Sequence, residues 1–378
     1  MRLPAAILGL VFCAAAAAGQ NGSIPVWTIG PFTRPAAGNP VIAPDPNAVF
    51  QDPIRHAPVH WEALHTFNPA AIVRGGKVYV LYRAEDNTGE MQIGMHTSRL
   101  GLAESSDGIH FKRSAEPVFY PAEDSQKQRE WPGGVEDPRI VESPDGGYVL
   151  TYTQWNRQTY SVGIATSHDL LHWTKYGPAF ASALHGKYAE LKYKSAGIVT
   201  KIEGGRLVAA RIRGKFWMYW GEGSIRLATS PDLIHWTPAE NAQGQPLELL
   251  QPRAGHFDST FPETGPPPIV TAKGIVVLYN GKNAALGGDP DLGAGAYATG
   301  EALFSASNPS RLLTQSDKPM LQPTLPYEKT GQYAAGTTFA EGLVLLHRRW
   351  FLYYGCADSL VAVVTAPSAD AEAASGSR

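Results

Sequence analysis

Two acids and an arginine stand together in the run Glu136-Asp137-Pro138-Arg139, directly before the apolar residues 140 and 141. Adjacent residues of a strand face opposite sides, so we expect one of the two acids to face a pocket and the other to pair with an arginine. The run therefore predicts a site of chemistry centred on Asp137, with a surface turn held by a local ion pair as the alternative.

A second group of polar residues precedes three prolines at positions 266–268. It contains His256, Asp258 and Glu263. Prolines stiffen a loop and make it a poor strand, so its polar groups are held out for use. The segment predicts contacts of His256 and Asp258 with a substrate and a chemical role for Glu263. Solvated loop carboxylates are the alternative.

A turn motif of the form Ser-x-Asp-x-x-His-aromatic occurs three times. Its aspartates, Asp107, Asp169 and Asp232, are 62 and 63 residues apart. The histidines of the motif occupy the same turn in each copy, so they cannot all reach one centre, and we expect them to brace their turns. No His, Cys and Asp residues show the spacing of a ligand set, so the sequence predicts neither a metal site nor a cofactor.

Five β-rich segments, each centred on a tyrosine, follow short apolar strands. They span residues 81–86, 151–156, 218–223, 278–283 and 353–358. Five copies of strand and turn predict an all-β fold, a five-bladed β-propeller over residues 61–366. A β-sandwich would not explain five equivalent tyrosine strands. Residues 20–60 are expected to pack on the propeller as an N-terminal extension, and residues 367–378 to form a disordered tail.

The inner strands of a propeller converge, so the ends of the five segments should ring one pocket. Asn68, Asp137 and Lys194 lead into the first three repeats and should lie on the same face. Acidic, amide and cationic groups together suit the directional hydrogen bonding of hydroxyl groups. Solvated turn residues are the alternative for any single member. The ring collected in this way adds Arg83, Asp86, Gln154, Glu222, Asn280, Lys282 and Asp358.

The ends and the composition of the chain bound its location and partners. Residues 1–19 combine one positive charge, an apolar run and small residues, which predicts a cleaved signal peptide and a secreted or periplasmic protein. No later stretch reaches the ~18 apolar residues of a membrane helix, so membrane insertion is not expected. A net charge of −2 without basic runs argues against nucleic acid as a partner. The sequence leaves a homo-oligomer open.

In their order, these motifs resemble glycoside hydrolase family 130, the β-mannoside phosphorylases and hydrolases. The resemblance covers nearly the whole chain after the signal peptide, and Glu-Asp-Pro-Arg is its most specific part. Arabinanases and fructosidases, other five-bladed enzymes, have similar Ser-Asp-His-Trp turns but not these ordered elements. The matching elements are Phe67-Asn68-Pro69-Ala70, Leu81-Tyr82-Arg83-Ala84, Gly134-Val135-Glu136-Asp137-Pro138-Arg139, Lys194-Ser195-Ala196-Gly197, Gly265-Pro266-Pro267-Pro268 and Tyr353-Tyr354-Gly355-Cys356-Ala357-Asp358.

The resemblance implies that Asp137 is a general acid that acts on a β-mannosidic bond with inversion, its proton passing through a hydroxyl of the mannose. It also implies that Asn68, Arg83, Lys194 and Asp358 hold the sugar ring. The full set of predicted substrate-binding residues is Asn68, Arg83, Glu136, Arg139, Lys194, His256, Asp258, Asn280 and Asp358.

The family divides by its nucleophile, since phosphate needs Arg, Lys and His whereas water needs a carboxylate base. Members that use phosphate typically have His where this chain has Asn280, and they lack Glu222 and Glu263. The sequence therefore predicts an inverting, exo-acting β-mannosidase for β-1,2-linked mannosides, with Glu222 or Glu263 as base. The first alternative is a β-mannoside phosphorylase that releases mannose 1-phosphate. The second is a glycan-binding propeller without catalysis.

Overall fold

The computed structural model describes residues 27–368, and these are almost entirely β-strand with connecting turns. The prediction of an all-β chain is confirmed. Within this range the helical pieces are short, and none is long and apolar enough to cross a membrane. The predicted signal peptide and most of the predicted tail lie outside the described residues. The helical pieces are α1 (Lys127–Glu130) and the 3-10 turns η1 (Ala183–Gly186) and η2 (Pro326–Glu328).

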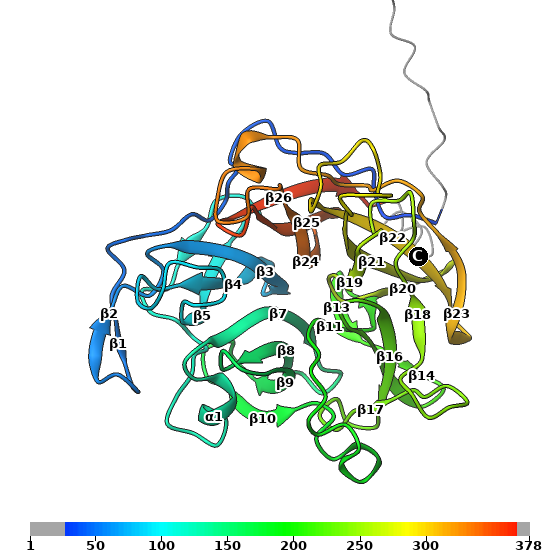
Figure 1. Ribbon diagram of the computed structural model, residues 1–378, viewed down its shortest axis with the longest axis horizontal. Coiled ribbons are helices and arrows are strands. Elements are labelled where there is room, and N and C mark those ends of the chain that lie inside the picture. The colour runs from blue at the N-terminus through cyan, green and yellow to red at the C-terminus, as the bar shows by residue number, and fades with distance from the viewer. Residues whose placement is uncertain (1–26, 369–378) are drawn as a thin grey trace, which may run out of the picture.

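The strands follow one another in antiparallel groups, which Figure 1 shows arranged around a common centre. The first group contains β3 (His65–Arg74), β4 (Lys77–Glu85), β5 (Ser98–Ser105) and β6 (Lys112–Arg113). The second contains β7 (Gly134–Glu142), β8 (Tyr148–Trp155), β9 (Tyr160–Ser167) and β10 (Thr174–Pro178). The third contains β11 (Ala196–Ile198), β14 (Arg211–Ile212), β15 (Lys215–Trp220), β16 (Ile225–Ser230), β17 (Thr237–Pro238) and β18 (Glu248–Leu250).

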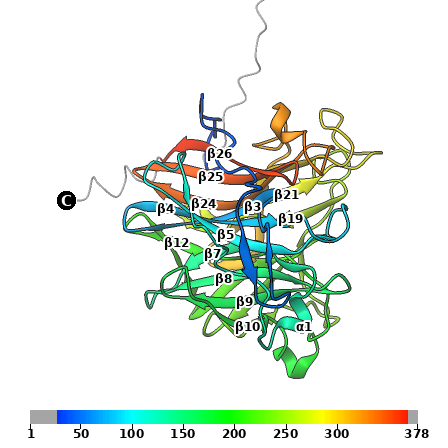
Figure 2. The same cartoon turned by 90° about the vertical axis from the view of Figure 1, so that its left-hand side faces the viewer.

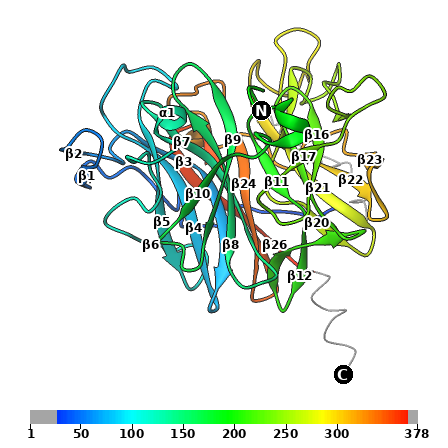
Figure 3. The same cartoon turned by 90° about the horizontal axis from the view of Figure 1, so that it is seen from below.

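Two further groups complete the chain. The fourth contains β19 (Phe261–Thr264), β20 (Ile269–Thr271), β21 (Gly274–Lys282), β22 (Tyr297–Ser305) and β23 (Asn308–Gln315). The fifth contains β24 (Thr338–Leu346), β25 (Arg349–Cys356) and β26 (Leu360–Pro367). A separate hairpin consists of β12 (Thr200–Glu203) and β13 (Arg206–Ala209). Seen from the side and from below, the fifth group lies next to the first (Figures 2 and 3).

Local sequence explains the strands and their turns. The tyrosine segments become β4, β8, β15, β21 and β25, which are rich in the branched and aromatic residues that favour strands. Gly75 and Gly76, with φ of 57° and 76°, form the two-residue turn between β3 and β4, where only residues that accept positive φ fit well. In the repeated turns, His110, His172 and His235 each lie within 2.8 Å of the aspartate of their own motif. Their predicted bracing role is confirmed.

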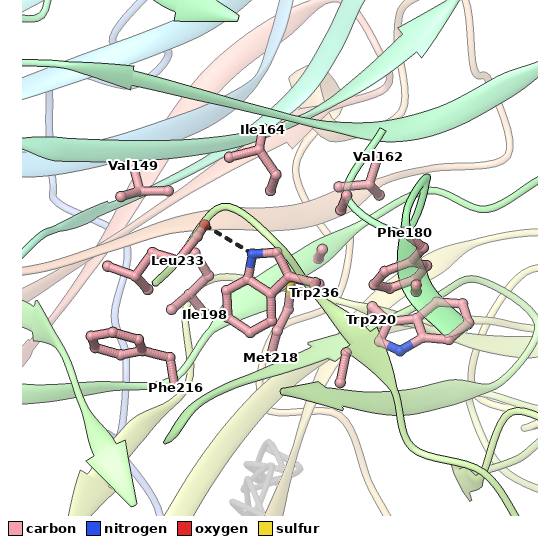
Figure 4. Close-up of a cluster of buried hydrophobic side chains, with 14 of the residues drawn as sticks. Val149, Val162, Ile164, Phe180, Ile198, Phe216, Met218, Trp220, Leu233 and Trp236 are labelled. Atoms are coloured by element: carbon pink, nitrogen blue, oxygen red, sulfur yellow. Dashed lines mark hydrogen bonds between the residues drawn. The ribbon is translucent and has the colours of Figure 1, made fainter. Parts of the chain in front are cut away.

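The hydrophobic core is divided into clusters that lie between neighbouring groups. One cluster packs β8 and β9 of the second group against β11 and β15 of the third, through Val149, Val162, Ile198 and Met218 (Figure 4). The indole of Trp236 is fully buried in it and donates a hydrogen bond to the Leu233 carbonyl at 2.9 Å. Other clusters lie between the first and second, third and fourth, fourth and fifth, and fifth and first groups. Strands covered on both faces are held by apolar burial.

Single parallel bridges join some neighbouring groups. They pair Ser98 with Gly134, Val208 with Glu142 and Thr200 with Ile269. Through these bridges, strands of the first, second and fourth groups form one continuous sheet. The hydrogen-bonded sheets do not divide into five separate blades, so the five-bladed propeller stays a prediction.

The chain before the first group contributes to the outer surface. Residues 33 and 42 form isolated bridges with Thr365 and Val361 of β26. The hairpin of β1 (Phe50–Asp52) and β2 (Ala57–Val59) then stands at the outer edge beside the first group (Figures 1 and 3). Glu301 of β22 accepts a hydrogen bond from the backbone of Ile29 at 2.8 Å. The described part of this segment is thus bonded to the fourth and fifth groups.

Candidate active site

A cavity of about 330 Å³ opens where strand ends of all five groups meet. Most of the predicted site residues line it. They are the acids Glu136, Asp137, Glu222, Glu263 and Asp358, the cations Arg83 and Lys194, and the amide Asn68. Residues that are far apart in sequence are thus brought together at the ends of the strands that carry them.

Two β-bulges aim Asn68 and Asp137 at the cavity. The register of β3 against β4 shifts between Phe67 and Pro69, and that of β7 against β8 shifts between Glu136 and Arg139. Asn68 and Asp137 have φ of 45° and 48°, a backbone conformation that non-glycine residues rarely adopt and that often occurs at functional sites. The Asn68 amide donates a hydrogen bond of 2.8 Å to Asp137 Oδ1.

The bulge in β7 also changes the direction of its neighbouring acid. Both Glu136 and Asp137 line the cavity, and both contact Arg83. The prediction that only one acid of the pair would face the pocket was wrong, because the extra residue of the bulge interrupts the alternation of a regular strand. The prediction that the other acid pairs with an arginine holds for Glu136.

Arg83 of β4 is the cation around which the acids gather. Its guanidinium donates hydrogen bonds to Glu85 at 2.7 Å, to Glu136 at 2.8 Å and to Asp137 at 3.2 Å. It also lies over the ring of Phe67, 4.5 Å from the centroid. Burial opposes its charge, but these carboxylates outweigh burial and raise the pKa of Arg83. Arg83 therefore stays charged and is held rigidly beside the cavity.

Three of the acids around Arg83, namely Glu136, Asp137 and Asp358, differ in proton affinity. Burial raises the pKa of Glu136 to about 7 although Arg83 opposes it, and the nearby Asp137 charge adds to the rise. Burial, against the pull of Arg83, likewise raises the pKa of Asp358 to about 7. Burial would raise the pKa of Asp137 too, but Arg83, Lys194 and Arg139 outweigh it and lower that pKa. Of these acids, Glu136 and Asp358 therefore hold a proton more readily than Asp137 does.

A second charged cluster, of Lys194, Glu222 and Glu263, also lines the cavity. Lys194 Nζ is 3.6 Å from Glu222 Oε1 and 3.4 Å from Glu263 Oε1. Glu263 is fully buried and accepts a hydrogen bond of 2.6 Å from the hydroxyl of Ser195. Burial raises the pKa of Glu263, Lys194 opposes this, and the charge of Glu222 adds to it. A carboxylate with raised proton affinity is suited to accept a proton near neutral pH.

Four predicted substrate-binding residues do not line the cavity. Asn280 is buried and holds β24, accepting from the Ala340 amide at 2.9 Å and donating to the Ala340 carbonyl at 3.0 Å. Asp258 pairs with Arg253. His256 lies 3.5 Å from an exposed aspartate, and Arg139 is buried behind the cavity, where it binds backbone carbonyls. The polar groups of these four residues contact other groups of the protein instead of the cavity. Such contacts between distant segments cannot be predicted from a single sequence.

Aromatic residues complete the wall, and the sequence interpretation gave them no role. Trp155 and Tyr160 lie on adjacent ends of β8 and β9. Tyr297 of β22, Tyr333 of the loop before β24 and Phe339 of β24 also line the cavity. The Trp155 indole donates a hydrogen bond to the Gly94 carbonyl at 2.9 Å and so fixes a rim loop. Such faces suit the apolar side of a sugar ring. Trp155 lies within the tyrosine segment of residues 151–156, which is a signal that the sequence did contain.

His65, Glu85 and His96 also approach one another, with potential ligand atoms within 4.8 Å. Their spacing in sequence gave no sign of this. Both oxygens of Glu85 already accept hydrogen bonds, from Arg83 at 2.7 Å and from Gln332 at 3.1 Å. A cation there would face the guanidinium of Arg83, so the arrangement is better suited to hydrogen bonding than to metal binding.

Acids outnumber cations around the cavity. This excess of acids agrees with the raised pKa values of Glu136, Glu263 and Asp358. The carboxyl groups are Glu85, Glu136, Asp137, Glu222, Glu263, Glu341 and Asp358, and the cations are Arg83, Arg139 and Lys194.

Comparison with known proteins agrees with this site. Residues 42–370 match the profile of a family described as β-1,4-mannooligosaccharide phosphorylase, glycoside hydrolase family 130. The chain belongs to glycoside hydrolase family 130. The resemblance inferred from the motifs is thereby confirmed.

Curated relatives of this family 130 chain are phosphorylases. A 1,2-β-oligomannan phosphorylase of Thermoanaerobacter sp. (strain X514) is 30% identical over 306 residues, which are 80% of this chain and 90% of the relative. A β-1,2-mannobiose phosphorylase of Listeria innocua is 26% identical over 272 residues, 70% of this chain and 65% of the relative. These names support the predicted alternative, phosphorolysis, better than hydrolysis.

Solved structures include more similar chains. One is 53% identical with a TM-score of 0.89, and the match covers 90% of this chain and 95% of the other. Its description states that the family 130 mannoside phosphorylases contain glycoside hydrolases that target β-1,2 mannosidic linkages in Candida mannan. A glycosyl hydrolase from Bacteroides ovatus is 51% identical, with a TM-score of 0.89 and the same coverage. The Listeria innocua β-1,2-mannobiose phosphorylase shares the fold, with a TM-score of 0.69 at 21% identity.

Proposed function

We propose that this protein cleaves terminal β-1,2-linked mannosides with inversion and that water receives the mannosyl group. One observation carries the proposal: Glu222 and Glu263 both line the cavity and flank Lys194. A phosphate dianion at this position would meet two carboxylates and a cation that they already neutralise. At an effective dielectric constant of 20, each like-charge contact at 4 Å opposes binding by about 4 kcal/mol. The solved structures that are 53% and 51% identical support the choice of water, because the descriptions of both refer to hydrolases.

Asp137 acts as the general acid and Glu263 as the base. Asp137 lines the cavity and is held by Asn68 and Arg83, and Glu263 lines the same cavity beside Lys194. In an inverting reaction, the base removes a proton from water as it attacks the anomeric carbon, and the acid protonates the departing oxygen. Because the pKa of Asp137 is lowered and that of Glu136 is raised, the proton that Asp137 delivers is proposed to come from Glu136 or through a hydroxyl of the sugar.

Asn68, Arg83, Lys194 and Asp358 are proposed to hold the terminal mannose. Asn68, Arg83, Lys194 and Asp358 all line the cavity and together offer an amide, two cations and a carboxyl group to the hydroxyl groups of the ring. The aromatic wall would cover the apolar face of the ring. The cavity of about 330 Å³ supports an exo mode of attack, because so small a space suits the end of a chain rather than its middle.

We also propose that the five groups are the blades of a five-bladed propeller. Hydrophobic clusters between each group and the next, including fifth and first, support a closed ring. Export to the periplasm or the medium is proposed on the sequence of residues 1–19 alone.

Phosphorolysis is the second candidate, and the curated relatives favour it. β-1,2-Mannobiose is incubated with the enzyme with and without inorganic phosphate, and mannose and mannose 1-phosphate are separated by anion-exchange chromatography. Hydrolysis predicts two mannose per mannobiose at the same rate in both mixtures, with α-mannose formed first in the NMR spectrum. Strict dependence on phosphate with mannose 1-phosphate as product would overturn the proposal in favour of phosphorolysis.

A further inference from the structure

Glu341 of β24 is a buried acid at the centre of the molecule to which neither the motifs nor the reaction assign a role. The register of β24 against β25 shifts between Ala340 and Gly342, so Glu341 is the extra residue of a bulge. Asn68 in β3 and Asp137 in β7 occupy bulges of the same kind at the start of their groups. By position, Glu341 is therefore the counterpart of two residues that line the cavity.

The bulge in β24 is built in place by its neighbours. Asn280 holds the backbone of Ala340 through both atoms of its amide, at 2.9 and 3.0 Å. Gly342 passes so close to β3 that a Cβ atom there would lie 2.7 Å from the Pro69 carbonyl oxygen. The direction of the Glu341 side chain is thus fixed from both sides.

Glu341 is fully buried, and its hydrogen bonding is incomplete. Neither carboxyl oxygen accepts a hydrogen bond with regular geometry from any residue of the described chain. Arg139 Nη1 lies 2.9 Å from Glu341 Oε1 as its ion-pair partner. A buried acid with so little hydrogen bonding costs free energy, so its presence calls for a compensating role.

Arg139 connects the two sides of the active site. Its Nη1 donates to the carbonyl of Asp137 at 2.9 Å, and its Nη2 and Nε donate to the carbonyls of Thr264 and Gly265 at 2.7 and 3.2 Å. Asp137 is the proposed acid, and Thr264 directly follows the proposed base, Glu263. One guanidinium therefore ties the backbone of the acid to the strand end that carries the base.

We propose that Glu341 is a positioning residue, which holds the guanidinium of Arg139 where it fixes the backbone of Asp137 relative to Glu263. The inference rests on the proposed function, but it applies whether water or phosphate attacks. Without Glu341, Arg139 Nη1 loses the partner on one side and can move away from the Asp137 carbonyl. Displacement of a catalytic group by about 1 Å can cost on the order of 100-fold in rate.

Replacement of Glu341 by alanine tests the role. We expect kcat on β-1,2-mannobiose to fall about 10- to 100-fold with KM within threefold, since no predicted sugar contact is removed. The loss should be much smaller on an aryl β-mannoside with a good leaving group, because such a substrate depends less on a well-placed acid. Glu341→Gln, which keeps the volume and an oxygen for Arg139, should restore most of kcat.

Glu328→Ala serves as the matched control, because Glu328 is equally buried but binds Arg34 and Tyr354 away from the cavity. It should lower thermal stability without any dependence on the leaving group. If Glu341→Ala does not fold, Glu341→Asp withdraws the same carboxyl by one methylene and should show the same pattern.

Wild-type kcat in Glu341→Ala, or equal losses on both substrates, would overturn the inference. An inactive wild-type enzyme on both mannosides would instead contradict the proposed function, so the two failures can be told apart.

Discussion

The proposed base is open to a sharp test through Glu263→Gln. The substitution removes the negative charge but keeps the volume, and the amide oxygen can still accept the 2.6 Å hydrogen bond from Ser195. Lys194 keeps its second acid, Glu222, at 3.6 Å. We therefore expect a folded protein with KM close to that of the wild type.

The expected loss of rate follows from the chemistry of the base. A missing general base costs about 10²- to 10⁴-fold in kcat, or about 3 to 5 kcal/mol of transition-state stabilisation. The Lys194–Glu263 attraction at 3.4 Å is worth about 5 kcal/mol at an effective dielectric constant of 20. Most of that attraction offsets the cost of burying the pair, so the loss of stability should be much smaller than the loss of rate.

Azide provides the decisive assay. It is already a nucleophile and needs no base, and with Glu263 neutral it meets one carboxylate fewer at Lys194. We expect azide to accelerate Glu263→Gln and to yield α-mannosyl azide, the inverted product, identified by NMR. Glu222→Gln is the matched control, because Glu222 is partly exposed and lies at a similar distance from Lys194. A wild-type kcat in Glu263→Gln, or azide rescue confined to Glu222→Gln, would refute the assignment of Glu263.

Two further predictions concern other buried acids. Asp137→Asn should lower kcat on β-1,2-mannobiose about 10²- to 10⁴-fold and far less on a dinitrophenyl β-mannoside; similar losses on both would exclude a general acid role. Glu301→Gln should raise the unfolding temperature at pH 8 but not at pH 5. Burial raises the pKa of Glu301 to about 8, although the hydrogen bond from the Ile29 amide opposes this rise. The native state therefore binds this proton more tightly than the unfolded state does. As a result, the stability of the wild type falls as the pH rises from about 4.5 to 8. An equal change of the unfolding temperature at both pH values would argue against that titration.

The strands could be predicted from sequence because the information for them is local. Each tyrosine segment combines strand-forming residues with an adjacent turn, and each became a strand. Asn68, Arg83, Asp137, Lys194 and Asp358 were placed at the cavity through motif order and the convergence of strand ends. The repeats therefore made it possible to predict those site residues that occupy equivalent positions in successive repeats.

The remaining features depend on contacts between distant segments. Asn280 occupies an equivalent strand end, yet its amide turns to the backbone of β24, which lies 60 residues further along the chain. Glu136 faces the cavity because of a bulge that alternation does not predict. Glu341 lies in a first strand rather than in a tyrosine segment, and only the register against β25 identifies its bulge. Such features arise from tertiary packing, which a single sequence does not express.

The contacts of the N-terminal segment with β26 have a practical consequence. β26 pairs with β25 on one side, and its other side is met at Thr365 and Val361 by residues 33 and 42. An uncovered strand edge is a template for pairing between molecules. Expression of a shortened chain that begins after residue 42 should therefore give a protein that self-associates, even though its catalytic cavity is intact. Light scattering of the shortened and the full chain at equal concentration measures this difference, and equal scattering would contradict a protective role of the segment.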